Sequence, residues 1–168
     1  MLMKIVTIGV YGFDEISFFD ALLNAKVDTF CDIRRRRGMR GSTYAFVNSM
    51  RLQSRLAELG IHYLHRIDLA PTKVVRDKQA RVDTLNKTAK RKRNVLSPEF
   101  IEAYCAECLV SFNPKCFLSN LENTTSVLAF FCVESLPEAC HRSLVAKKLE
   151  EELGLQVEHI LPHESTYC

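Results

Sequence analysis

The stretch VLAFFCVESLPEACHRSL, residues 127–144, joins an apolar segment to a polar turn and then to a second periodic segment. Residues 127–133 are nearly all apolar, which predicts a central strand that is covered on both faces. Apolar residues recur at helical spacing after Cys140, so we expect a helix over residues 140–154 that is ended by Gly154. A buried strand that leads directly into a helix is typical of an α/β fold.

The same alternation of strands and helices continues along the chain. Four further strands are predicted at KIVTIG (4–9), VDTFCDI (27–33), IHYLHRI (61–67) and QVEHIL (156–161). Further helices are predicted over residues 15–25 behind an Asp14 cap, over 48–60, from Ser97 and Pro98 onward, and over 114–121. We therefore expect one α/β domain over residues 1–168, with a mostly parallel central sheet of about five strands and helices on both faces. The first two strands should pair in parallel through a right-handed crossover.

The composition is that of a globular protein in water. Of 168 residues, 47% are hydrophobic and 26% are charged, and the formal net charge is +3. No apolar run approaches the roughly 20 residues that cross a bilayer, so we expect no membrane partner. MLMKIVTIG lacks the basic region and cleavage site of a signal peptide. The odd number of cysteines, seven, then indicates free thiols in a reducing cytoplasm.

The positive charge is concentrated in two segments. Residues 73–93 hold nine Lys and Arg against two acids, and residues 34–40 hold five arginines. Weak apolar periodicity predicts that residues 73–95 form an insertion-like segment that is basic, partly helical, exposed and mobile. Such segments are typical of proteins that bind phosphate groups, although a solvated surface explains them equally well.

Functional groups of parallel sheets gather where strands end and helices begin. This rule selects three loops: GVYGF at 9–13, which contains Tyr11, DIRRRRGMRG at 32–41, and CVESLPEACHR at 132–142. Four consecutive arginines cannot all be structural, so the second loop is either a solvated loop or a phosphate-binding loop. Tyr44 and Phe46 follow it closely and could stack on bases.

The third loop allows a structural interpretation and a catalytic one. Ser135 and Glu138 have capping-box spacing, so the loop can be no more than a well-made helix start. Cys132 and Arg142 loosely resemble a phosphatase cysteine loop, but the acids between them would repel a phosphate. We therefore favour the helix start over the cysteine loop.

Helical angles place Arg142 in the buried arc of the predicted helix, with His141 beside it. On a helix that begins at Cys140, the Cys140 side chain points roughly away from this arc. A buried arginine requires an anion, which predicts a carboxylate partner, Asp32 or Glu134, or a bound ligand.

A zinc site at Cys132, Cys140 and His141 is a weaker hypothesis. Adjacent residues on a regular helix point about 100° apart, and the spacing lacks a Cys-x2-Cys pair, so we expect no metal and no cofactor. A second group of cysteines at first suggests a metal or redox half-site. Because their positions on predicted helices match the core, we expect buried structural thiols at Cys105, Cys108 and Cys116.

Several stretches taken in order, TIG, DIR, LAELGIHYLH and CVESLPEACHRSLVAKKL, resemble the DUF488 family, whose members carry a closing Cys-x-Glu…Cys-His-Arg segment. The resemblance covers nearly the whole chain and implies one α/β domain of bacterial or archaeal type without a settled activity. The chain departs from the common pattern of the family at RRRGMRG and DLAPT. A ligand bound by these two loops can therefore differ from that of other members. The resemblance maps the recurrent polar residues of the family onto Asp32, Arg34, Cys132, Glu134, Cys140, His141 and Arg142.

We expect an enzyme-like domain that acts on or binds a phosphate-containing ligand, a nucleotide or a nucleic acid, at the carboxyl ends of the strands. The expected catalytic residues are Asp32, Glu134, His141 and Cys140, and the expected anion-binding residues are Arg34, Arg36, Arg142 and Tyr11. One alternative is a non-catalytic nucleic-acid-binding module that uses residues 34–40 and 73–93. Another is a protein-interaction domain in which Asp32 and Arg142 form only a buried salt bridge.

Overall fold

The computed structural model describes residues 3–163, except for the side chain of Arg91. Its strands form one five-stranded sheet in which all neighbours are parallel, in the order β3-β2-β4-β1-β5. The predicted α/β fold class is confirmed, and the described sheet is wholly parallel. The strands are β1 (Lys4–Ile8), β2 (Thr29–Asp32), β3 (His62–His65), β4 (Val127–Phe131) and β5 (Val157–Ile160).

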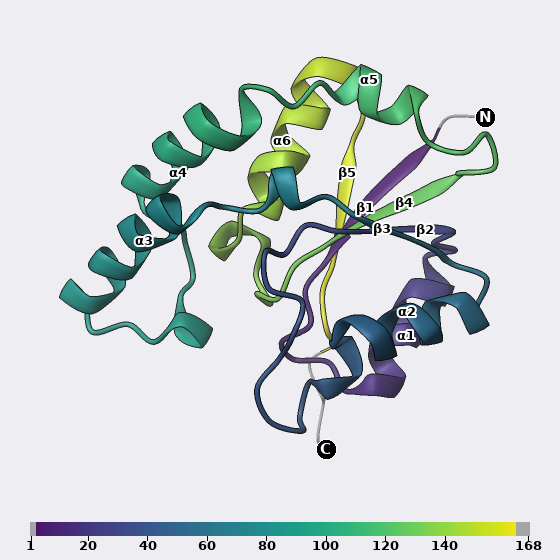
Figure 1. Ribbon diagram of the computed structural model, residues 1–168, viewed down its shortest axis with the longest axis horizontal. Coiled ribbons are helices and arrows are strands. Elements are labelled where there is room, and N and C mark those ends of the chain that lie inside the picture. The colour runs from purple at the N-terminus through teal and green to yellow at the C-terminus, as the bar shows by residue number, and fades with distance from the viewer. Residues whose placement is uncertain (1–2, 164–168) are drawn as a thin grey trace.

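Helices cover both faces of this sheet (Figure 1). The main helices are α1 (Glu15–Asn24), α2 (Ser49–Glu58), α3 (Lys73–Leu85), α4 (Pro98–Tyr104), α5 (Pro114–Ser119) and α6 (Arg142–Leu153). α1 and α2 pack on the face that carries Phe30 and Phe131, while α3 to α6 pack on the face that carries Cys31 and Phe130. None of the described helices is long and apolar enough to cross a membrane.

β4 lies at the centre of the sheet, as its apolar sequence predicts. Leu128, Ala129, Phe130 and Phe131 are buried, and alternate side chains enter the two opposite cores. β2 pairs with one side of β4, and β1 pairs with the other. The predicted pairing of the first two strands is therefore wrong. β4 lies between them, because a position inside the sheet covers both of its apolar faces.

Local capping begins and ends several helices as predicted. Asp14 accepts a hydrogen bond from the Ser17 backbone, and the Ser17 hydroxyl accepts one from the Asp14 backbone. Gly154 ends α6 with a positive φ of 65°. Asn48 precedes α2, but its side chain accepts from the Met39 N–H rather than from the helix. Asn48 therefore ties the loop after β2 to the start of α2.

The last helix begins two residues later than predicted. Residues Pro137–Ala139 form a short 3-10 helix, η5, and Cys140 is extended with φ −137° and ψ 145°. α6 begins at Arg142, with His141 at the N-cap position and no side-chain cap. The capping box predicted at Ser135 and Glu138 is not formed at α6, because Glu138 lies inside the η5 turn and Ser135 precedes that turn.

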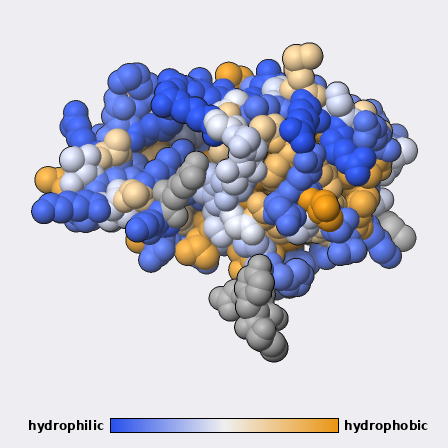
Figure 2. All heavy atoms as spheres, turned by 90° about the horizontal axis from the view of Figure 1, so that it is seen from below, coloured by the Kyte–Doolittle hydropathy of each residue, from blue (hydrophilic) through white to orange (hydrophobic). Residues whose placement is uncertain are grey.

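The basic segment 73–95 is not uniformly exposed. α3 buries Val75 and Gln79, and the Gln79 side-chain oxygen accepts a hydrogen bond from the Ser97 backbone. Past η3 (Lys90–Lys92), Arg93 donates two hydrogen bonds to the carbonyl of Ala139. The segment is thus held at both ends while its lysines face water. Figure 2 shows hydrophilic side chains gathered over the end of the molecule that holds α3.

The cysteines of the α4–α5 region are not all in the core. Cys108 is buried, whereas Cys105 and Cys116 are exposed, so the prediction of buried structural thiols holds for Cys108 alone. α4 continues into a π-helix, η4 (Cys105–Leu109), which buries Cys108 and Leu109 and leaves Cys105 exposed. All cysteines of the described residues are free thiols, and Cys168 lies outside that part of the chain.

Candidate functional site

The loops that follow β1, β2 and β4 share the carboxyl edge of the sheet (Figure 1). Because these strands are parallel neighbours, the structure brings together the three loops that the sequence selected. The backbone N–H groups of Val10 and Tyr11 both donate to the carbonyl of Val133, and Ile33 donates to the carbonyl of Phe131. Backbone hydrogen bonds therefore hold the three loops against one another.

Asp32, at the end of β2, is fully buried and pairs with Arg34. The guanidinium donates from Nε to Oδ1 (2.9 Å) and from Nη2 to Oδ2 (2.8 Å). Tyr63 on β3 donates its hydroxyl to Oδ2 (2.8 Å), and burial raises the pKa of Tyr63 to about 12, which keeps this proton in place. Arg34 also donates to the carbonyl of Val47 and lies 4.7 Å from the centre of the Phe131 ring. This closed ion pair fixes the start of the loop after β2.

Arg142 is fully buried and bridges β1 to the loop after β4. Its Nε donates to Thr7 Oγ1 (3.2 Å), its Nη2 to the carbonyl of Ser135 (2.8 Å), and its Nη1 to the carbonyl of Glu134. Thr7 Oγ1 also shares a hydrogen bond with His159 Nδ1 (2.7 Å) on β5. One guanidinium therefore links β1, the loop after β4 and, through Thr7, the edge strand.

The predicted carboxylate partner of Arg142 is replaced by peptide carbonyls. Within the described residues no carboxylate forms an ion pair with Arg142, and Asp32 is occupied by Arg34. The Asp32–Arg142 salt bridge of the interaction-domain hypothesis is therefore not formed. The planar fork of an arginine can satisfy its donors on backbone carbonyls, which carry partial negative charge and exist at every residue.

Gly9 lies where the backbone after β1 approaches this link most closely. A Cβ at Gly9 would lie 1.8 Å from the Glu134 carbonyl oxygen and 2.8 Å from Arg142 Nη1. We expect Gly9→Ala to lower the free energy of unfolding by about 2 to 3 kcal/mol, because the loop after β4 must move away. Urea titration measures this change. Gly38→Ala is the matched control, since a Cβ there meets no atom of the described residues within 4 Å. Equal stability of the two variants would contradict the close approach.

Cys132, Cys140 and His141 form a compact, buried cluster at the same edge. His141 Nδ1 lies 3.8 Å from the Sγ of Cys132 and 3.7 Å from the Sγ of Cys140. His141 Nε2 lies 3.0 Å from the carbonyl oxygen of Ile33, which can only accept a hydrogen bond. Nε2 therefore carries the hydrogen, and Nδ1 presents its lone pair to the two thiols.

The prediction that Cys140 points away from the buried side of this helix is wrong. It assumed that Cys140 belongs to a regular helix, in which adjacent side chains point about 100° apart. Cys140 is extended and 2% exposed, so its side chain is not bound by the helical angle and turns toward the ring of His141. Within the described residues, the two thiols and this ring are the one group of donors with the proximity that a metal ion requires.

The two thiols of the cluster differ in acidity. Burial disfavours a thiolate at Cys140, but the neighbouring Cys132 thiol holds the pKa of Cys140 well below its usual range. The proximity of Cys140, together with burial, raises the pKa of Cys132 well above its usual range. Cys140 is therefore the thiol that carries a negative charge more easily.

Glu134 lies between this cluster and the basic segment. Its buried Oε1 is 3.5 Å from Arg93 Nη2 and 3.8 Å from Lys90 Nζ, and it has no hydrogen-bond partner among the described residues. Burial, together with the nearby Cys140, raises the pKa of Glu134 to about 7. Glu134 thus connects the charges of residues 73–93 to the cysteine–histidine cluster.

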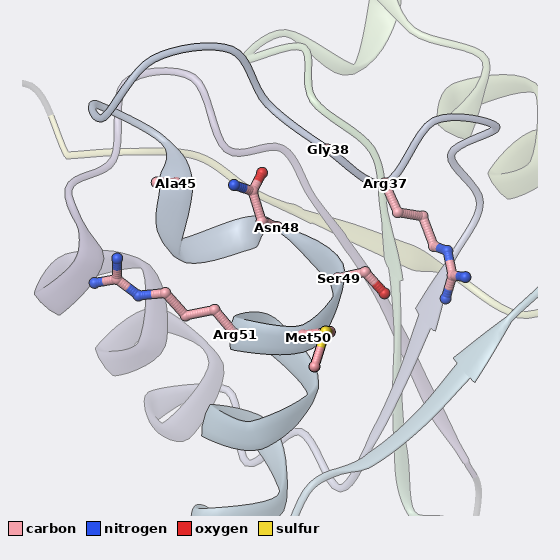
Figure 3. Close-up of a pocket in the computed structure, with 7 residues that line it drawn as sticks. All are labelled: Arg37, Gly38, Ala45, Asn48, Ser49, Met50 and Arg51. Atoms are coloured by element: carbon pink, nitrogen blue, oxygen red, sulfur yellow. The ribbon is translucent and has the colours of Figure 1, made fainter.

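The remaining predicted site residues lie nearer the surface. Arg36 is exposed, and Tyr11 is half-buried with its ring centre 5.2 Å from that of Tyr44. The loop after β2 and the start of α2 enclose an open depression of about 670 Å³ (Figure 3), in which the side chains of Arg37 and Arg51 extend in opposite directions. The depression is lined by Arg37, Gly38, Ala45, Asn48, Ser49, Met50 and Arg51.

The sequence interpretation did not identify Thr7, Tyr63 or Arg93 as parts of this edge. Each contacts a residue that is at least 10 positions away and belongs to another element. The sequence hint that Tyr63 belongs to the site was its position in the predicted strand 61–67. Its contact with Asp32 depends on the β2–β3 register, which pairs Asp32 with His65. Local sequence patterns do not specify that register.

The fold and this edge define an α/β protein with a wholly parallel described sheet and a buried Cys-Cys-His cluster at its carboxyl edge. The family model of DUF488, described as a domain of unknown function, matches residues 16–149, and the chain belongs to this family. The resemblance inferred from the motifs is thereby confirmed. No curated protein and no solved structure matches the chain.

Proposed function

We propose that this protein binds a phosphate-containing ligand, a nucleotide or a nucleic acid, at the carboxyl edge of its sheet and acts on it there. The observation that carries the proposal is that two basic segments, distant in sequence, are both anchored at this edge. Arg35 donates to the carbonyls of Ala70 and Pro71, directly before α3. Arg93 donates to the carbonyl of Ala139, next to the cluster.

The side chains best suited to phosphate are the exposed ones. Arg34 and Arg142 are buried and already hydrogen-bonded inside the protein, so the proposal does not depend on them. Arg36, Lys90 and Lys92 are exposed, and exposed cations are the usual contacts of a phosphate backbone. The half-buried rings of Tyr11 and Tyr44, from two loops of the same edge, offer an aromatic surface for bases.

The second candidate function is a non-catalytic nucleic-acid-binding module. The same exposed charges favour it, because phosphate binding needs no chemistry at the edge. The two candidates differ in the role of Glu134. In an enzyme, Glu134→Gln should abolish the conversion of a bound oligonucleotide or nucleotide to products, detected by chromatography, while affinity is kept. In a binding module no product forms with either protein.

We also propose a cytoplasmic location, since free thiols persist in a reducing compartment.

Binding to a fluorescent single-stranded oligonucleotide should weaken steeply as salt increases. Substituting Arg36, Lys90 and Lys92 together by alanine should reduce the slope of log K against log salt by about 2, because each phosphate contact contributes about 0.7. Fluorescence anisotropy between low and physiological salt gives both slopes. Point substitutions are preferable to deletion of residues 73–93, because α3 buries Val75 and Gln79.

Lys115→Ala is the matched control for this experiment. Lys115 is exposed on α5, which precedes β4 and so lies at the opposite edge of the sheet (Figure 1). Its substitution should leave the slope unchanged. Parallel titrations with ATP and with duplex DNA distinguish a nucleotide from a nucleic acid. Absence of binding to all of these ligands at low salt, or an equal loss in the Lys115 variant, would contradict the proposal.

A further inference from the structure

The donor atoms of Cys132, Cys140 and His141 have the spacing of a tetrahedral zinc site. Zinc binds thiolate sulfur at about 2.3 Å and imidazole nitrogen at about 2.0 to 2.1 Å, so tetrahedral geometry places S and N about 3.6 Å apart and two sulfurs about 3.8 Å apart. The observed Sγ–Nδ1 distances are 3.8 Å and 3.7 Å, and all three atoms lie within 4.8 Å of one another. An ion can therefore enter with small side-chain adjustments.

The imidazole of His141 is already oriented as a metal ligand. Its Nε2 hydrogen is directed at the carbonyl of Ile33 (3.0 Å), and the lone pair of Nδ1 is directed at the thiols. Metal-binding histidines commonly donate their other N–H to a backbone carbonyl in this manner, which fixes both the tautomer and the ring plane. The carbonyl that accepts this hydrogen bond belongs to Ile33, directly after β2, whereas the three cluster residues follow β4.

Charge also favours a divalent cation at this place. Cys132, Cys140 and His141 are 6%, 2% and 6% exposed, so an uncompensated charge among them is unfavourable. Two thiolates and a neutral imidazole carry two negative charges, which one divalent ion cancels. Glu134 Oε1 is buried and lies 3.5 Å from Arg93 Nη2, but it has no hydrogen bond within residues 3–163, and a water on the ion is a donor of the kind that it lacks.

We propose that Cys132 Sγ, Cys140 Sγ and His141 Nδ1 bind a zinc ion, whose fourth position is left to water or another small ligand. Two sulfurs and one nitrogen form a soft donor set that favours zinc over magnesium or calcium. Three protein ligands with an open fourth position are typical of catalytic zinc, which activates a bound water. The inference goes beyond the proposed function and is independent of it, because phosphate binding by exposed cations needs no metal.

The test is a metal titration of the full chain, stripped with chelator and kept reduced. After addition of zinc and dialysis, elemental analysis should find about one zinc ion per chain. Cobalt(II) in place of zinc should give the intense near-ultraviolet band of thiolate-to-cobalt charge transfer together with visible bands of a tetrahedral ion. Zinc should also raise the melting temperature of the wild-type protein.

Matched variants locate the ion. Cys140→Ser and His141→Gln should lose the bound zinc and the zinc-dependent rise in melting temperature, whereas Cys108→Ser, at a buried thiol outside the cluster, should keep both. If a cluster variant fails to fold, the cobalt spectrum of the wild type still decides the question through its thiolate band. The proposal would be overturned if the wild-type protein bound neither zinc nor cobalt(II) under reducing conditions. It would also be overturned if the cluster variants kept one zinc ion per chain.

Discussion

Replacing Asp32 by alanine is expected to lower the free energy of unfolding by about 3 to 5 kcal/mol, because a buried charge then loses its partner. Asp32 is fully buried and Arg34 is 3% exposed, so water cannot take over the role of the carboxylate. In the part of the chain that the structure describes, the Nη1 of Arg34 already has no hydrogen-bond partner, and the substitution would add Nε to the unsatisfied donors. Urea or thermal unfolding of the purified variant measures the loss.

Two comparisons distinguish the effect of the unpaired Arg34 charge on stability from the effect of lost packing. The double substitution Asp32→Leu with Arg34→Met removes both charges and should recover much of the stability, since an apolar pair of similar volume replaces a buried ion pair with little loss. Tyr63→Phe removes only the hydroxyl that donates to Asp32 and should lower stability by about 1 kcal/mol. If Asp32→Ala were no worse than Tyr63→Phe, the ion pair would not be the main constraint at the end of β2.

Replacing Arg142 by alanine should lower the free energy of unfolding by about 3 to 4 kcal/mol. The buried carbonyl of Glu134 and the partly buried carbonyl of Ser135 lose their donors, and each unsatisfied buried acceptor costs about 1 to 3 kcal/mol. The empty volume of a large, fully buried side chain adds to this loss. Chemical denaturation gives the magnitude, and amide hydrogen exchange over residues 134–140 should accelerate, because Arg142 holds that loop against β1.

The conservative variant and a surface arginine serve as controls for Arg142. Arg142→Lys keeps the charge, but its single ammonium cannot reproduce the fork of the guanidinium, so part of the loss should remain. Arg55→Ala, on the exposed side of α2, should change stability little, because exposed ion pairs contribute weakly. Unchanged hydrogen exchange in Arg142→Ala would argue against the bridging role.

Local patterns predicted the elements of this fold well. The apolar run of β4 indicated a central strand, and the side chain of Asp14 and the positive φ of Gly154 act where the sequence placed a helix start and a helix end. Each of these signals depends on neighbours within a few residues, through burial period or capping. The start of α6 was misplaced because the η5 turn and extended Cys140 compete with a helix over the same residues.

The sequence predicted where these polar side chains gather, but not which of them pair. Asp32, Glu134, Cys140, His141 and Arg142 all lie at the carboxyl edge, as the rule for parallel sheets indicates. Their partners were not foreseen. Asp32 pairs with the arginine two positions along the chain, and Arg142 binds carbonyls. A backbone carbonyl that acts as a partner cannot be recognised from residue types, because every residue has a backbone carbonyl.

The sequence by itself determined the α/β class, the order of strands and helices, the family and the edge at which polar groups gather. Only the tertiary structure decided which of those groups touch. His141 reaches the carbonyl of Ile33 across 108 positions, and Arg142 reaches Thr7 across 135. Both contacts require β4 to lie between β2 and β1 in one register. Strand order and register follow from the packing of the whole sheet, so no local pattern encodes them.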